Sequence, residues 1–214
     1  MRFRELSIPG AFVIEGDPRR DNRGSFARTF CAREFRERGL DVRVAQCNVS
    51  RTANKGTIRG MHFQRAPHEE AKLIRCLKGK VWDVLLDLRE DSSGFGRWEA
   101  IVLHEDSDRA MYVPAGVAHG FQTMSDEVLL HYQMSLPYAP EASTGVRWDD
   151  PYFGISWPLP NATISAKDRN FPLYVSSRDS GLSLPAAARC SIRPINFSGA
   201  TRSIRPPESL RVAS

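Results

Sequence analysis

The sequence predicts an all-β protein made of short strands, with one short helix near its start. Segments from residue 42 onward alternate side chains with a period of two, which is typical of strands. Turn residues such as Gly56, Gly79 and the run Pro114–Gly116 separate these segments at close spacing. Helical periodicity is rare in the same region. Many short strands with few helical intervals favour a sandwich or a barrel.

The expected elements follow in chain order. Residues 32–38 favour a helix, and Gly39 lies where a glycine commonly ends one. Strands are expected over residues 42–47, 56–64, 72–77, 81–88, 98–103, 110–113 and 128–134. In the run 81–88, one face carries Trp82, Val84, Leu86 and Leu88, and the other carries Val81, Asp83, Leu85 and Asp87.

Composition and charge divide the chain into a domain and a tail. The 214 residues are 41% hydrophobic and 26% charged, which is ordinary for a globular domain with a sizeable core. Residues 176–214 hold six arginines and two acidic residues, or +4 of the total net charge of +5. We therefore expect a nearly neutral domain over 1–175 and a disordered, basic Ser/Arg/Pro-rich tail over 176–214. Binding of nucleic acid or acidic lipid by this tail is the alternative.

Cysteine usage and hydropathy predict a cytoplasmic protein without a membrane partner, and the nearly neutral domain predicts no nucleic-acid partner. The four cysteines (Cys31, Cys47, Cys76 and Cys190) are scattered and form no CxxC pair, so we expect reduced thiols. No apolar stretch is long enough for a transmembrane helix, and the N-terminus leads into no apolar signal region.

Two motifs carry the candidate chemistry. Residues 56–64 read Gly-Thr-Ile-Arg-Gly-Met-His-Phe-Gln, and residues 114–121 read Pro-Ala-Gly-Val-Ala-His-Gly-Phe. A regular strand would place His62 and Gly60 on one face and Arg59 on the other, with Gly60 leaving room for a ligand. The spacing of the two motifs resembles the cupin superfamily. That resemblance implies a cupin-like double-stranded β-helix, or jelly roll, with its site inside the barrel.

The first motif departs from the metal-binding cupins. Gln64 stands where those proteins have a second histidine, and an amide oxygen is a poor substitute for imidazole at a transition-metal site. His62, Glu69 and His119 could still form a facial triad. A metal-dependent cupin enzyme is therefore an alternative interpretation.

Further motifs narrow the resemblance to one family. They appear in order as Asp21-x-Arg-Gly24, Gln46-x-Asn48, Lys72-Leu73, Asp83–Arg89, Gly96-x-Trp98, Tyr132, Tyr138-x-Pro140, Trp148–Pro151, Ile155–Pro158 and Ser165–Asp168. With the two motifs above, they resemble the dTDP-4-dehydrorhamnose 3,5-epimerase family over residues 10 to 172. The resemblance implies inversion at carbons next to a ketone of a nucleotide-linked 4-keto sugar. It also implies a cofactor-free homodimer in which the N-terminal segment reaches the neighbouring subunit's site.

The resemblance implies a role for each candidate catalytic residue. His62 is the expected base, and Asp168 is the partner that fixes its tautomer. Tyr132 is the expected acid on the opposite face of the sugar, and Lys72 is expected near the developing enolate oxygen. The alternatives are a helix cap for Asp168, core packing for Tyr132 and a surface position for Lys72.

The resemblance also implies a set of substrate-binding residues. Guanidinium groups suit phosphate oxygens, because they can donate two parallel hydrogen bonds. The expected residues are Arg23 and Arg59 for the diphosphate, Tyr138 for stacking on the base, and Gln46, Asn48, His119 and Lys167 for further contacts.

Three positions depart from the thymidine-type pattern. Arg19 replaces an aromatic residue, Arg28 replaces an acidic one, and Ser143 stands at a third acidic position. Arg28 therefore joins the candidate substrate-binding residues. The resemblance implies conversion of dTDP-4-dehydro-6-deoxy-D-glucose to dTDP-4-dehydro-L-rhamnose as the leading expectation. The departures motivate the alternative that the sugar is linked to CDP, GDP or UDP, and a shift of the alignment by one or two residues near 16–28 is the other explanation for them.

Several questions remain beyond the sequence. It does not decide between inversion at C3, at C5 or at both, because the same base and acid serve both carbons. The role of the tail and the glycoside or polysaccharide made downstream are also not decided. A sugar ketoisomerase and a non-catalytic sugar-nucleotide binding module are the remaining rivals.

Overall fold

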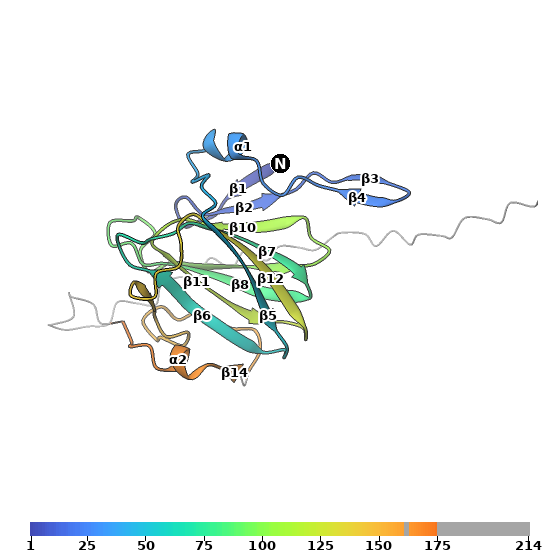
Figure 1. Ribbon diagram of the computed structural model, residues 1–214. Coiled ribbons are helices and arrows are strands. Elements are labelled where there is room, and N and C mark those ends of the chain that lie inside the picture. Colours follow the sequence, from blue (N-terminus) through green and yellow to red (C-terminus); the bar gives the residue numbers. More distant parts are fainter. Residues whose placement is uncertain (161–162, 175–214) are drawn as a thin grey trace, which may run out of the picture.

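The computed structural model describes residues 1–160 and 163–174, so the predicted tail over 176–214 lies outside the described residues. Two sheets face each other in a jelly roll, as predicted (Figure 1). The first sheet has the spatial order β1 (Arg2–Glu5), β2 (Phe12–Glu15), β10 (Arg109–Val113), β7 (Lys72–Lys78), β12 (Val128–Met134) and β5 (Gln46–Thr52). The second has the order β13 (Ser143–Gly145), β6 (Thr57–Gln64), β11 (Val117–Thr123), β8 (Lys80–Asp87) and β9 (Trp98–His104).

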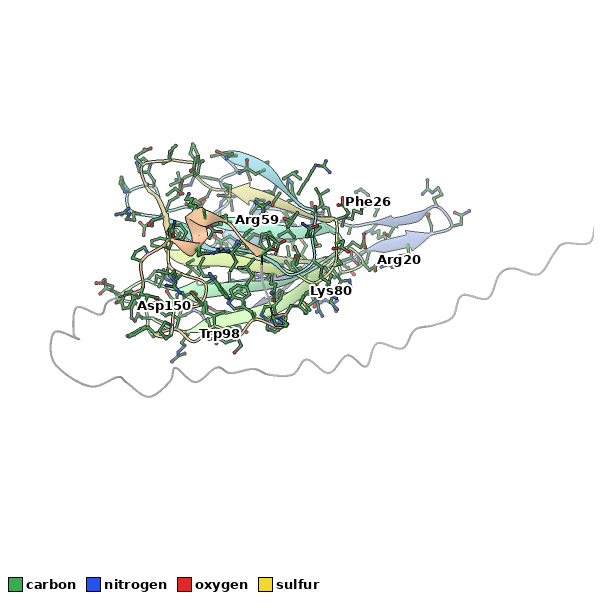
Figure 2. The ribbon with its side chains drawn as sticks, turned by 90° about the horizontal axis from the view of Figure 1, so that it is seen from below. Arg20, Phe26, Arg59, Lys80, Trp98 and Asp150 are labelled. Atoms are coloured by element: carbon green, nitrogen blue, oxygen red, sulfur yellow. The ribbon has the colours of Figure 1, made fainter. Side chains whose placement is uncertain are left out.

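The remaining elements are short. Strand β14 (Thr163–Ile164) pairs in parallel with β6, and helix α2 (Ala166–Arg169) follows it directly. Helix α1 (Ala32–Arg36) packs outside the first sheet through Phe35. Strands β3 (Arg19–Asp21) and β4 (Gly24–Phe26) form a hairpin that extends away from the two sheets (Figures 1 and 2). Within the described ranges, no helix has the length and apolar character that a membrane crossing needs.

Strand alternation places the core in layers, and β8 shows the principle. Val81 and Leu85 point between the two sheets, where they join the central hydrophobic cluster with residues of the first sheet such as Ile74. Val84 and Leu86 point outward, where they are covered by aromatic residues of the C-terminal segment such as Phe153. The predicted division of 81–88 into two faces is therefore confirmed.

Two local predictions need correction. The helix predicted over 32–38 ends at Arg36. Gly39 has the left-handed conformation expected after a helix end, with a φ of +69°. The strand predicted from residue 42 begins only at Gln46. The backbone N–H of Arg43 donates to Oδ1 of Asp41 at 3.0 Å, and this local turn competes with strand pairing. The short strands β1 to β4 were not predicted, because segments of three or four residues carry little periodic signal.

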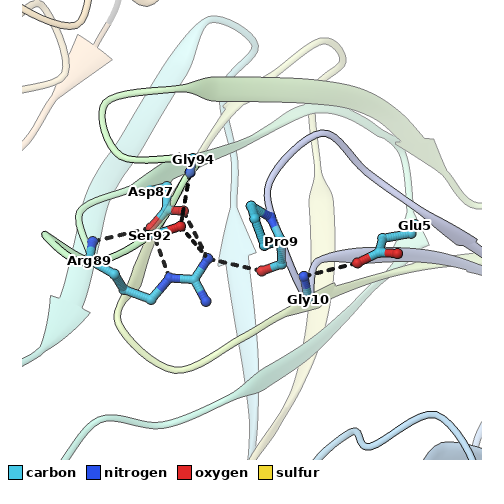
Figure 3. A network of polar contacts seen from close by, with 7 residues as sticks. All are labelled: Glu5, Pro9, Gly10, Asp87, Arg89, Ser92 and Gly94. Atoms are coloured by element: carbon cyan, nitrogen blue, oxygen red, sulfur yellow. Dashed lines mark hydrogen bonds and ion pairs between the residues drawn. The ribbon is translucent and has the colours of Figure 1, made fainter.

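A buried charged network fixes the loop after β8 to the N-terminal segment (Figure 3). Asp87 is fully buried, and Arg89 donates to both of its carboxylate oxygens at 2.8 Å. Ser92 donates to the same carboxylate at 2.6 Å, and Arg89 also donates to the carbonyl of Pro9 at 2.9 Å. Burial acts to raise the pKa of Asp87, but the bonds from Arg89 and Ser92 outweigh it and leave this pKa below its usual value.

Strands β6 and β11 approach each other unusually closely at two glycines. A Cβ added to Gly60 would lie 2.5 Å from the Cα of Gly120. A Cβ added to Gly120 would lie 2.6 Å from Sδ of Met61 and 3.0 Å from the Cα of Gly60. The prediction that Gly60 leaves room for a ligand is therefore wrong. This glycine leaves room for the neighbouring strand.

We expect Gly120→Ala to destabilise the protein by about 1–3 kcal/mol, because overpacking at a tight contact forces the backbone to shift. Chemical denaturation of the full chain would measure the change. Gly16→Ala is the matched control, since its added Cβ would find its nearest neighbour at 3.2 Å rather than 2.6 Å. Equal stability of the two variants would contradict the steric account of this contact.

Candidate active site

A cavity of about 320 Å³ opens between the two sheets. It is lined from the first sheet by Asn48, Val49, Ser50, Lys72, Tyr132 and Met134, and from the second by Arg59, His62, Phe63, Gln64, His119, Phe121 and Ser143. Glu70, Tyr138 and Lys167 complete the lining. Eight of the twelve predicted site residues thus line one cavity: His62, Tyr132, Lys72, Asn48, Arg59, His119, Tyr138 and Lys167.

His62 in the cavity wall is paired with Asp168, which lies behind it and does not itself line the cavity. Nε2 of His62 lies 2.8 Å from Oδ1 of Asp168, whose side chain is only 4% exposed. The other carboxylate oxygen accepts the backbone N–H of Gly60 at 3.3 Å. Burial acts to raise the pKa of Asp168, but its contacts with His62, Gly60 and Ser165 leave this pKa lowered overall. The carboxylate is therefore charged and can accept a hydrogen bond from Nε2–H of His62, which would leave Nδ1 as the ring nitrogen available to a substrate.

The local sequence explains how Asp168 reaches His62. Ser165 caps helix α2 by accepting the backbone N–H of Asp168 at 3.0 Å. Strand β14, immediately before this cap, is paired with β6, which carries His62. The pairing of β14 with β6 and the cap at Ser165 together hold the short segment that carries Asp168 next to His62. The alternative that Asp168 is only a cap or surface residue is not supported by this geometry.

A bulge in β6 overturns the predicted alternation of the first motif. His62 pairs with His119, whereas Arg59 pairs with Phe121, so β6 has one more residue than β11 in this interval. The extra residue reverses the alternation, and Arg59 and His62 both line the cavity. The prediction that these two side chains lie on opposite faces is therefore wrong. Figure 2 shows Arg59 within the body of the protein, away from the hairpin that carries Arg20 and Phe26.

Lys72 is buried in the cavity wall, so the surface alternative is wrong for this residue. Its side chain is 7% exposed. Nζ lies 3.0 Å from Oε1 of Glu70 and donates to the backbone carbonyl of His62 at 3.2 Å. The second oxygen of Glu70 is buried and has no hydrogen-bond partner among the described residues.

A second histidine–carboxylate pair lies beside the first. Nε2 of His119 is 2.7 Å from Oδ1 of Asp83, which is fully buried at the centre of β8. Because β6 and β11 place His62 and His119 opposite each other, the two imidazoles lie on adjacent strands of one wall. The ring of Tyr132 packs against that of His119 with centroids 5.9 Å apart.

Tyr132 comes from the facing sheet. Its hydroxyl makes no hydrogen bond with any other residue of the described chain, so simple core packing with a satisfied hydroxyl does not describe it. Burial raises the pKa of Tyr132 well above its usual value, the charge of Asp83 acts in the same direction, and Arg59 opposes both. The phenol therefore holds its proton at neutral pH and can donate it.

Polar side chains at the cavity mouth are connected to each other. Gln46 donates to Oδ1 of Asn48 at 3.0 Å and accepts the backbone N–H of Tyr138 at 2.9 Å. Gln46 itself does not line the cavity. Tyr138 is 53% exposed, which leaves its ring face open for stacking. Arg59 donates to Oγ1 of Thr52 at 3.1 Å and to the carbonyl of Arg51 at 3.3 Å.

Besides Gln46, two further predicted binding residues lie outside this cavity. Arg23 sits on the β3–β4 turn, where it forms an ion pair with Asp21 at 2.6 Å. Arg28 forms an ion pair with Glu34 of helix α1 at 2.9 Å. Within one copy of the described chain, neither guanidinium lines the cavity that holds His62.

The possible metal triad of His62, Glu69 and His119 is not assembled. Glu69 is exposed and does not line the cavity. Across residues 1–160 and 163–174, no three side chains of histidine, cysteine, aspartate or glutamate gather into a group that could hold a metal ion.

Sequence reasoning missed two carboxylates of the site. Asp83 shares a strand face with the buried residues Val81 and Leu85, and this pattern could have predicted that its side chain points inward. Glu70 stands two residues before Lys72, a spacing that places two extended residues on the same side. Neither signal was sufficient without the facing strand, because exposed carboxylates show the same spacings.

Comparisons of the sequence and the structure with known proteins point to one family. A model of the dTDP-4-dehydrorhamnose 3,5-epimerase family matches residues 5–175. The chain is 42% identical to an enzyme of that name from Methanothermobacter thermautotrophicus, over 79% of this chain and 92% of the relative. It is 39% identical to a dTDP-4-dehydrorhamnose 3-epimerase from Streptomyces niveus, over 89% of this chain and 91% of the relative.

Solved structures agree with the sequence comparison. The crystal structure of dTDP-4-dehydrorhamnose 3,5-epimerase from Bacillus anthracis, with TDP and pyrophosphate bound, superposes with a TM-score of 0.78. Its sequence is 35% identical, and the match covers 81% of this chain and 99% of that one. From the family model, the curated relatives and the solved structures together, the chain belongs to the dTDP-4-dehydrorhamnose 3,5-epimerase family.

Proposed function

We propose that the chain epimerises dTDP-4-dehydro-6-deoxy-D-glucose at C3 and C5 to give dTDP-4-dehydro-L-rhamnose. The observation that carries this proposal is the placement of His62, paired with Asp168, and the unbonded hydroxyl of Tyr132 on facing sheets of one cavity. Inversion next to a ketone needs a base on one side of the sugar ring and an acid on the other. The cavity offers both, with a buried ammonium between its walls.

The reaction balances with these groups alone. His62 takes the proton from the carbon next to the C4 ketone, and Asp168 stabilises the imidazolium that forms. The electron pair moves to the ketone oxygen, where Lys72 stabilises the enolate. Tyr132 returns a proton to the opposite face of the same carbon. The two residues then exchange protons with solvent, which restores the starting protonation states.

The relatives named above indicate which nucleotide carries the sugar. The three described above are dTDP-sugar enzymes by name or bind TDP, so they favour dTDP over the CDP, GDP and UDP alternatives. Within one copy of the described chain, neither Arg19 nor Arg28 lines the cavity. Arg59 and His119 are suited to the diphosphate, and Tyr138 to the base.

The proposed assembly is a homodimer in which the β3–β4 hairpin reaches a second copy. Phe26 on this hairpin is 78% exposed, and the hairpin extends from the body of the protein (Figure 2). Strand β5 is the edge of the first sheet, beside the cavity, and Val49 on it is 52% exposed. An exposed apolar residue on a projecting hairpin and an open sheet edge both favour association. Arg23 would then complete the cavity of the neighbouring subunit.

The proposed location is the cytoplasm. Cys31, Cys47 and Cys76 are free thiols in the described chain, which is the expected state in a reducing compartment.

Proton NMR of the full chain with the dTDP-4-keto sugar in D2O tests the proposed function. We expect deuterium at both C3 and C5 with the wild type, and at least 100-fold slower exchange at both carbons with His62→Ala, on the order of the contribution of general base catalysis. The affinity for dTDP serves as the control and should be unchanged. Exchange at C3 alone would indicate the single-centre reaction named for the Streptomyces niveus relative. Exchange at neither carbon would contradict the proposal.

Tyr132→Phe separates proton removal from proton return. The variant keeps the ring that packs against His119 but lacks the acidic hydroxyl. We expect exchange of the substrate protons to continue, while formation of the inverted product falls by about 100-fold, as for loss of a general acid. Chromatography of the products against the NMR exchange rate makes the comparison. An inversion rate equal to that of the wild type would rule out Tyr132 as the acid.

Mixed dimers test the proposed assembly. Arg23→Ala and His62→Ala should each lose activity as homodimers, because each removes one component from every site. In a heterodimer of the two, one site combines the intact His62 of one chain with the intact Arg23 of the other. Co-expression should therefore restore about a quarter of wild-type activity, since half of the dimers are mixed and each has one complete site. Absence of recovery would show that Arg23 does not act across subunits.

A further inference from the structure

We infer that Glu70 is a positioning residue that aims the ammonium group of Lys72 at the reacting ketone oxygen. The inference rests on the proposed function and assigns to it a residue that the family motifs above do not include. It starts from the contacts of Nζ: 3.0 Å to Oε1 of Glu70 and 3.2 Å to the carbonyl oxygen of His62.

The number of donors on the ammonium group decides its direction. A lysine ammonium has three N–H donors and can rotate freely about its last bond. Two acceptors engage two of these donors and stop that rotation. Because Lys72 lines the cavity, the third donor is left for a ligand there. With the carbonyl of His62 as its only acceptor, the ammonium would have no fixed orientation.

The same arrangement links the cation to the base. His62 supplies its imidazole as the proposed base and its backbone carbonyl as one of the two acceptors of Lys72. Glu70 supplies the other from the segment just before β7. The distance between the proton-accepting group and the enolate-stabilising group is therefore set by two acceptors, one on β6 and one in the segment before β7. Effective stabilisation of a developing charge depends on such preorganisation.

Burial shows that this contact is specific to Lys72. The side chain of Glu70 is 3% exposed, and its second oxygen has no partner in the described part of the chain. A buried carboxylate needs a compensating cation, and Lys72 is the one that an ion pair connects to it. Glu70 thus acts through Lys72 and not through a second group of the protein.

A double-mutant cycle tests this inference, with kcat, KM and dTDP affinity measured on the full chain. Glu70→Ala is expected to lower kcat by about 100-fold with KM and dTDP affinity unchanged, the size expected for a misplaced catalytic group. Lys72→Met removes the cation, and in that background Glu70→Ala should cause no further loss. Glu70→Gln keeps an acceptor oxygen and should retain kcat within about 10-fold of the wild type.

The controls separate positioning from folding. Glu15→Ala is the matched control, because Glu15 also holds a cation, Arg109 at 2.9 Å, but lies on β2 outside the cavity. It should leave kcat unchanged. If Glu70→Ala does not fold, Glu70→Ala combined with Lys72→Met removes both charges and still measures whether position 70 matters without the cation.

The outcomes distinguish failure of the role assigned to Glu70 from failure of the proposed function. The role of Glu70 would be overturned if Glu70→Ala left kcat unchanged. It would also be overturned if Glu70→Ala lowered kcat by the same factor in the Lys72→Met background as in the wild type. The exchange reaction of the wild-type chain would stand in both cases. A wild-type chain that exchanges neither substrate proton would overturn the proposed function, and the role of Glu70 with it.

Discussion

The contact between Gly60 and Gly120 is the constraint on which the site depends. The two backbones approach so closely that neither position has space for a Cβ atom. At the same point β6 carries one residue more than β11, and the resulting bulge turns Arg59 to the same side as His62. Without this contact, regular alternation would direct one of these side chains out of the cavity.

Charge pairing in the cavity follows from that geometry. Three carboxylates that are nearly inaccessible to solvent, Asp168, Asp83 and Glu70, each hold one basic group: His62, His119 and Lys72. The two histidine–carboxylate pairs join residues far apart in the chain, so their geometry depends on the surrounding sheets, whereas Glu70 and Lys72 are two residues apart. Buried ion pairs contribute little to net stability, because the desolvation of both charges offsets their attraction. Their value here lies in fixing the direction of the groups that face the substrate.

A second group of buried polar residues, outside the cavity, connects parts of the fold. Asp87, Arg89 and Ser92 connect the loop after β8 to Pro9 near the N-terminus, on the side of the fold shown in Figure 3. Asp83 lies four residues before Asp87, on the same face of β8. One strand therefore carries a carboxylate for the cavity and a carboxylate for the framework, and both are fully buried.

The sequence by itself determined the all-β class and the positions of most central strands, and its resemblance to the family implied that His62, Lys72, Tyr132 and His119 belong to one site. Period-two patterning and motif spacing are local properties, so they can be read without the fold. Only the tertiary structure decided that Arg59 shares the cavity face of His62, that Gly60 makes room for a strand, and that Glu70 holds Lys72. The first two facts depend on pairing between β6 and β11, which are far apart in the chain, and the third depends on the burial of Glu70 and Lys72 in the folded protein. A bulge or a cross-strand contact leaves no periodic trace in the residues that form it.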